Sequence, residues 1–277
     1  MVGKNFLRLP RLNHSDNSNI HIAKRSLSQN FLIDENISRK IVRALDIQHE
    51  DIVVEIGPGK GALTNVLAEA PVKIFAVEKD DQLSYQLKKH YAANPRIRII
   101  NADFLEYELP KSLHKIKVIG NIPYNLTTKI ISRLVDRRNL IKVAVIMVQS
   151  EVADRLIARE GTKSYGALSV RLQLTSSVKK LFNVSRFCFR PSPEVDSSVL
   201  LIKFKDQMYI QDEEKFVTFV KSAFSMRRKM IRHFISHKYG KIKAQELQDK
   251  INTKRIEELS PREIYDLFLA LERPSAH

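Results

Sequence analysis

A short apolar strand followed at once by a glycine-rich turn and a helix is the feature that most constrains the fold. The β-branched run Ile52–Ile56 stops at Gly57-Pro58-Gly59-Lys60-Gly61, and residues 62–70 have the pattern of a helix. This order predicts a unit in which the turn brings backbone N–H groups close to a ligand. The spacing G-x-G-x-G differs from the dinucleotide fingerprint G-x-G-x-x-G, so the turn alone does not define the ligand.

Two further predicted strands end near acidic residues. Residues 73–77 lead to Glu78, and residues 97–100 lead to Asp103. A carboxylate at the tip of the second strand can accept hydrogen bonds from a ribose diol, and the other can accept from an adenine amino group. Either acid alone would ordinarily be a solvated loop residue. Because open α/β sheets bind ligands at the carboxyl edge, their occurrence on successive strands favours a nucleoside site.

The fourth predicted strand ends in Asn121-Ile122-Pro123-Tyr124 and opens on the same edge. Asn121 offers an acceptor to an exocyclic amine, Tyr124 offers a flat face for stacking, and Pro123 leaves neighbouring carbonyls free. This combination suits a pocket that holds an amino-bearing base taken out of its stack. Alone, the motif reads as an ordinary turn after a strand. Its position beside the predicted nucleoside site favours the base pocket.

The composition points to a polyanionic partner. Among 277 residues, 47 are Lys or Arg and 31 are Asp or Glu, which gives a formal charge of +16. Nucleic acid is the first candidate partner and an anionic membrane surface the second. No apolar run approaches the roughly 20 residues that a membrane span needs. The single cysteine, Cys188, excludes an internal disulfide and a cysteine-cluster metal site, so we expect no metal and a reducing, cytoplasmic location.

Basic residues are concentrated late in the chain. Between Lys215 and Gln245 there are nine Lys or Arg residues and no acid. Apolar residues from Phe216 to Phe224 recur at helical spacing, which predicts a helix that packs on one face and displays a basic one. Such a run is ordinarily a solvated face, but an uncompensated one of this length favours RNA contact. The candidate RNA-binding residues are Arg227, Arg228, Lys229 and Arg232.

Residues 1–22 show no periodicity and contain one acid, Asp16. They lack the apolar core of a secretory signal, so export is not expected. We interpret them as a flexible basic arm that touches RNA. An organellar transit peptide is the alternative, and it would place the protein in an organelle.

These motifs, taken together, resemble those of the ribosomal RNA adenine N6,N6-dimethyltransferases, the dimethyladenosine transferase family that acts on the small subunit. The resemblance covers almost the whole length of the chain, and its joint specificity is high although each motif alone is weak. The segments that carry it are 28–32, 55–59, 121–124, 165–170, 189–197 and 223–229.

The resemblance implies an α/β fold, with a Rossmann-like class I S-adenosylmethionine-dependent methyltransferase domain followed by a small all-helical C-terminal domain. The expected organisation is the arm at 1–22, the methyltransferase domain at 23–206 and a helical RNA-binding domain at 207–277. Asn30 and Leu32 would close over the cofactor, and Gly57 would approach its methionine end. Glu78 would hold the ribose, and Asp103 would bind the cofactor adenine.

The same resemblance would place Asn121 between the cofactor and the target base, with Tyr124 and Phe189 on either side of the flipped adenine. The N6 atom of adenine is a poor nucleophile because its lone pair is delocalised into the ring. If the Asn121 oxygen and a carbonyl of Ile122 or Pro123 accept both N6 hydrogens, the nitrogen can become pyramidal and attack in line.

The expected activity is dimethylation of adjacent adenosines near the 3′ end of 16S rRNA during ribosome biogenesis, by a monomer that binds small ribosomal subunits. Many family members carry Gly where this chain has Ser28. With Ser at this position the chain is similar to the macrolide-resistance methyltransferases, which act on large-subunit rRNA. An enzyme of that type is therefore an alternative. Another alternative is an RNA-binding assembly factor with secondary methyltransferase activity. A dehydrogenase is disfavoured by the glycine spacing.

Overall fold

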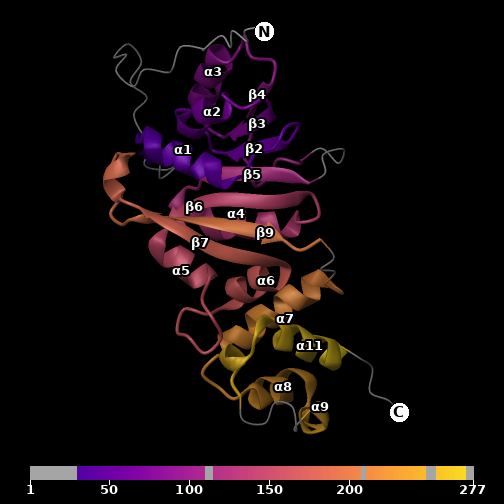
Figure 1. Cartoon of the computed structure of the whole chain (residues 1–277). Helices are drawn as coiled ribbons and strands as arrows, with labels where there is room; N and C mark the ends of the chain where they lie inside the picture. The colour runs from indigo at the N-terminus through magenta and orange to yellow at the C-terminus, as the bar shows by residue number, and fades with distance from the viewer. Residues whose placement is uncertain (1–29, 110–114, 207–209, 248–253, 273–277) are drawn as a thin grey trace.

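The computed structural model describes residues 30–109, 115–206, 210–247 and 254–272. The predicted arm at residues 1–22 and Ser28 lie outside the described residues. Figure 1 shows a twisted sheet flanked by helices, with a group of C-terminal helices at one end of it. The predicted fold class is confirmed.

Seven strands of the described part form one sheet in which β9 runs antiparallel to its neighbours. The first five strands across the sheet are parallel, as expected for β-turn-α units. Their carboxyl ends therefore meet at one edge. In order across the sheet the strands are β4 (Ile97–Asn101), β3 (Lys73–Glu78), β2 (Ile52–Ile56), β5 (Ile116–Asn121), β6 (Ile141–Gln149), β9 (Ser197–Phe204) and β7 (Ser176–Val184).

Helices cover both faces of the sheet. Along β6, Val145 belongs to one apolar cluster and Ile146 to the other, because successive side chains of a strand point to opposite faces. The first cluster lies under α1 (Glu35–Ala44), α2 (Ala62–Leu67) and α3 (Asp81–His90). The second lies under α4 (Thr127–Asp136), α5 (Ser150–Leu156) and α6 (Ala167–Thr175). The helix predicted at residues 62–70 is thus confirmed but ends sooner, at Leu67.

A third apolar cluster holds the C-terminal helices together. These are α7 (Glu213–Ser225), α8 (Ile231–Tyr239), α9 (Lys241–Glu246) and α11 (Pro261–Glu272). Phe216 and Phe268 pack edge to face with their ring centroids 5.3 Å apart. Val170 and Leu174 of α6 join this cluster, whereas Leu172 of the same helix joins the second one. Helix α6 therefore packs on both parts of the molecule, and the domain boundary at 206 and 207 stays a prediction.

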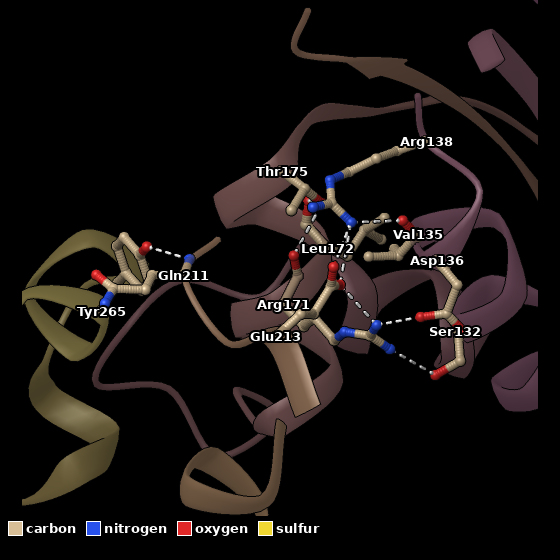
Figure 2. Close-up of polar contacts among 10 residues, drawn as sticks. All are labelled: Ser132, Val135, Asp136, Arg138, Arg171, Leu172, Thr175, Gln211, Glu213 and Tyr265. Atoms are coloured by element: carbon tan, nitrogen blue, oxygen red, sulfur yellow. Dashed lines mark hydrogen bonds and ion pairs between the residues drawn. The ribbon is translucent and has the colours of Figure 1, made fainter. Parts of the chain in front are cut away.

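Ion pairs between Glu213 of α7 and two buried arginines connect α7 to the sheet region (Figure 2). The Glu213 carboxylate accepts hydrogen bonds from Arg138 Nη1 at 2.8 and 3.0 Å and from Arg171 Nη2 at 2.9 Å. Arg171 also pairs with Asp136 and contacts Ser132 Oγ at 3.4 Å. Because the Arg138 and Arg171 side chains are only 7 % and 11 % exposed, Glu213 compensates cations that have little access to water.

The basic segment at residues 215–245 contributes to α7, α8 and α9. More of its positive charges are paired with acids than its composition predicts. Lys215 pairs with Asp212 at 2.8 Å, and Lys243 pairs with Glu246 at 3.3 Å. Arg227 pairs with Glu257 and donates to the Lys163 carbonyl at 3.1 Å. The acids lie outside the segment, so a count within it could not show them.

Candidate active site

A cavity of about 220 Å³ opens at the carboxyl edge of the parallel strands. Its walls come from β1 (Phe31–Leu32), from the turn after β2 and from the ends of β3 and β5. Phe189 is absent from its lining. The predicted site residues that line the cavity are Asn30, Leu32, Gly57, Glu78, Asp103, Asn121, Ile122, Pro123 and Tyr124.

The glycine turn has a conformation that side chains rarely allow. Gly57 has φ 61° and Gly59 has φ 60°, both in the left-handed region. A Cβ at Gly59 would also come within 3.1 Å of the Phe31 ring. The Gly59 N–H donates to Glu78 Oε2 at 2.9 Å. The turn is therefore held against the end of β3, with its backbone close to the cavity.

The carboxyl groups of Glu55 and Glu78 line the cavity. Glu78 Oε1 accepts the Asp80 N–H at 2.8 Å, and burial raises the pKa of Glu78 above its ordinary value. Glu55 is fully buried, and desolvation raises its pKa to about 8, although Thr64 Oγ1 donates to it at 2.7 Å. Glu55 is thus protonated at neutral pH. A single acid within an apolar strand gives no periodic signal, so the sequence pattern does not single out Glu55 as a site residue.

Asp103 is held at the cavity wall by Lys79. The Lys79 ammonium donates to Asp103 Oδ2 at 2.8 Å, and the Leu105 N–H donates to Oδ1 at 2.9 Å. Partial burial acts to raise the pKa of Asp103, but the hydrogen bond from Lys79 lowers it below the usual range. The ionised carboxylate has further lone pairs available to accept an amino hydrogen.

The Asn121 amide has a defined orientation. Its Nδ2 donates to the Asn30 carbonyl at 3.1 Å. The reversed amide would place two acceptors against each other, so this contact assigns the nitrogen. The Asn121 Oδ1 is thereby directed away from Asn30 and remains available as an acceptor at the cavity.

Backbone contacts distinguish the Ile122 carbonyl from the Pro123 carbonyl, the two candidate acceptors for an amino hydrogen of the target base. The Pro123 carbonyl accepts from the Leu126 N–H at 3.0 Å and from Thr127 Oγ1 at 3.4 Å. No described donor contacts the Ile122 carbonyl, whereas the Ile122 N–H donates to Met147 at 3.0 Å. The Ile122 carbonyl is therefore the better acceptor for a ligand.

The two predicted stacking residues differ in exposure. Tyr124 is half-buried at the start of a short 3-10 helix (Tyr124–Leu126), and its hydroxyl lies 2.8 Å from Ser197 Oγ. Phe189 is only 3 % exposed and belongs to the first apolar cluster. It lies in β8 (Phe189–Arg190), where it pairs with Leu32 of the cavity wall. Its backbone thus adjoins the cavity while its side chain packs in the core.

The fold and the cavity define the class of protein: a Rossmann-like methyltransferase. The residues fit S-adenosylmethionine, because a left-handed glycine turn gives close backbone approach and Glu78 can accept from ribose hydroxyls. A family model described as ribosomal RNA adenine dimethylase matches residues 20–273. The chain belongs to this family and is a methyltransferase that uses S-adenosylmethionine.

Individual proteins support the same assignment. The chain is 45 % identical to ribosomal RNA small subunit methyltransferase A of Chlorobaculum parvum, over 79 % of this chain and 80 % of the relative. It is 40 % identical to the Mycoplasma mobile protein of the same name, over 84 % and 90 %. Among solved structures, a dimethyladenosine transferase from Plasmodium falciparum has a TM-score of 0.78 at 26 % identity, over 86 % of this chain and 96 % of that one.

The 23S rRNA methyltransferase ErmE has a TM-score of 0.68 at 25 % identity, covering 88 % of this chain and all of that structure. The fold is therefore shared with a dimethyladenosine transferase and with an enzyme whose name refers to 23S rRNA. Within the described ranges, no helix is both long and apolar enough to cross a membrane.

Proposed function

We propose that this enzyme dimethylates N6 of adjacent adenosines near the 3′ end of 16S rRNA, in small ribosomal subunits during their assembly. The names of the curated relatives support the small subunit as substrate. The observation that carries the chemistry is the orientation of the Asn121 amide by Asn30, beside the Ile122 carbonyl.

In this proposal the two oxygens accept the two N6 hydrogens of a flipped adenine. The acceptors face the positive charge that develops on N6 as its lone pair attacks, so they stabilise the transition state more than the ground state. S-adenosylmethionine supplies an activated methyl group. The methylated nitrogen is acidic and loses its proton to water, so no dedicated base is required.

The remaining site residues have proposed binding roles. Glu78 would accept the ribose hydroxyls and Asp103 the adenine amino group, while Asn30, Leu32 and Gly57 would form the wall around the cofactor. Tyr124 would supply the stacking face for the target base. A second face from Phe189 would require its side chain to leave the apolar cluster, and the sandwich stays a prediction.

RNA would be held by exposed cations in the turn between α7 and α8 and at the start of α8. Arg228, Lys229 and Arg232 are exposed, whereas Arg227 is half-buried against Glu257. Contacts from such residues to phosphates would position RNA without reading its sequence. We therefore propose Arg228, Lys229 and Arg232 as phosphate contacts and Arg227 as a contributor through its charge.

Labelled S-adenosylmethionine and undermethylated small subunits test the proposal, with large subunits in a parallel reaction. We expect label on adenosine N6 near the 3′ end of 16S rRNA. Label confined to large subunits would instead establish the macrolide-resistance type of activity. Binding to small subunits without label in either would establish an assembly factor.

A matched pair of amide variants tests the catalytic assignment. Asn121→Ala should lower methyl transfer by about 10²- to 10³-fold, the cost of losing one oriented transition-state hydrogen-bonding group. Its S-adenosylmethionine affinity should change little. Asn139→Ala removes an exposed amide next to the amino end of β6 and should retain full activity. Turnover of Asn121→Ala within a few-fold of the parent enzyme would remove Asn121 from the mechanism.

A further inference from the structure

An exposed phenylalanine lies on a segment beside the active site. Phe187 is 74 % exposed in the short 3-10 helix Arg186–Cys188 that precedes β8. The Arg186 guanidinium lies over its ring, 5.1 Å from the centroid. Exposing so large an apolar surface is unfavourable in water, and the mechanism proposed above makes no use of it.

Hydrogen bonds fix this segment to the cavity on one side through β1. The Ile33 N–H donates to the Cys188 carbonyl at 2.9 Å, and Phe189 pairs with Leu32, which lines the cavity. Phe187 is therefore two residues from a backbone that is paired with the cavity wall.

On the other side the segment is fixed through the strand that supports Tyr124. The Arg186 N–H donates to Asp196 Oδ1 at 2.9 Å, and Arg186 Nη1 donates to the Glu194 carbonyl at 3.1 Å. The next residue, Ser197, lies 2.8 Å from the Tyr124 hydroxyl. Two connections, one through β1 and one through Asp196, thus place the Phe187 backbone beside the cavity wall and beside the strand that contacts Tyr124.

We infer that Phe187, supported by Arg186, is a stacking platform for the nucleotide that neighbours the flipped adenosine. Flipping the target removes a stacking partner from the adjacent base, and an exposed aromatic ring can replace it. An aromatic face can stack on a base but offers no donor to a phosphate oxygen, which favours contact with a base over contact with the RNA backbone. This inference rests on the proposed RNA substrate.

Kinetics on undermethylated small subunits test the platform. A stacked base contributes about 1–3 kcal/mol, so Phe187→Ala should lower kcat/KM for RNA by about 5- to 150-fold. The affinity for S-adenosylmethionine, measured by calorimetry, should stay within twofold. Phe187→Tyr keeps an aromatic face and should restore most of the activity. Tyr85→Ala is the matched control, because Tyr85 is 69 % exposed on α3 and should have no effect.

A fluorescence measurement gives a second readout that a structural role would not change. The chain contains no tryptophan, so Phe187→Trp and Tyr85→Trp each carry one fluorophore. With a short RNA loop that carries two adjacent adenosines, we expect quenching for Phe187→Trp and none for Tyr85→Trp.

The outcomes separate the two proposals. If the parent enzyme methylates small subunits but Phe187→Ala keeps full kcat/KM and Phe187→Trp is not quenched, the platform is refuted and the proposed function stands. If the parent enzyme methylates no adenosine in small subunits, the proposed function itself has failed. Loss of activity in Phe187→Tyr as well as in Phe187→Ala would also contradict stacking, because the ring is retained.

Discussion

Neutralising Glu213 should destabilise the protein where α7 meets the sheet region. Glu213→Gln keeps the size of the side chain but removes the charge shared by Arg138 and Arg171. Removing one partner of a buried ion pair costs about 3–5 kcal/mol. Arg171 keeps Asp136 and Ser132, and Glu213 is itself 28 % exposed, which lowers the expected cost. We expect a loss of about 2–4 kcal/mol in the free energy of unfolding.

Urea unfolding followed by circular dichroism measures this loss, with Asp266→Asn as the control. Asp266 pairs with Arg262 on the surface, where the side chains are 52 % and 67 % exposed, so its removal should cost less than about 1 kcal/mol. The S-adenosylmethionine affinity of Glu213→Gln should stay unchanged because Glu213 does not line the cavity. Equal stability of the two variants would refute the assignment of Glu213 as the compensating charge.

Three further predictions concern the cofactor, pH and RNA. Glu78→Ala should weaken S-adenosylmethionine binding by about 1–3 kcal/mol in calorimetry, through lost charge-assisted hydrogen bonds, and unchanged affinity in a folded variant would exclude Glu78 from the site. Because burial raises the pKa of Glu55 from 4.5 to about 8, its contribution to stability is full below pH 4.5 and is lost as the pH rises through 8. Glu55→Gln should therefore flatten the decline of stability across that window in pH-dependent unfolding, and an identical decline in both proteins would contradict the raised pKa. Neutralising four cations together should lower the log–log salt slope of RNA binding by about three, with thermal stability measured alongside, and an unchanged slope in a folded variant would reduce them to a solvated face. These cations are Arg227, Arg228, Lys229 and Arg232.

Local patterns allowed much of the fold to be predicted from the sequence. Asp is a residue type that favours the position before the first turn of a helix, and Asp34 Oδ1 accepts the Ile37 N–H at 3.0 Å at the start of α1. Ser260, followed three residues later by Glu263, has the sequence pattern of a capping box, and each side chain accepts the other's backbone N–H, at 3.2 and 2.8 Å. Such contacts span three residues, so the sequence contains both partners within one turn.

Contacts between distant residues were beyond the sequence patterns. The pairing of Glu213 with Arg138 joins positions 75 residues apart, and no periodicity relates them. The Asn30 carbonyl that orients Asn121 lies 91 residues earlier. The burial of Phe189 follows from the pairing of β8 with β1, two strands too short to give an alternating signal.

The position of β9 has a consequence for how the chain folds. β9 pairs with the edge of β6 that faces away from β5, and it is the strand that joins β7 to the sheet. It follows both β6 and β7 in the sequence. During synthesis β6 can pair with β5 as soon as it is made, whereas β7 must wait for residues 197–204 before it can join the sheet. A chain truncated before Ser197 would keep a long apolar strand with an open hydrogen-bonding edge, which is a template for aggregation.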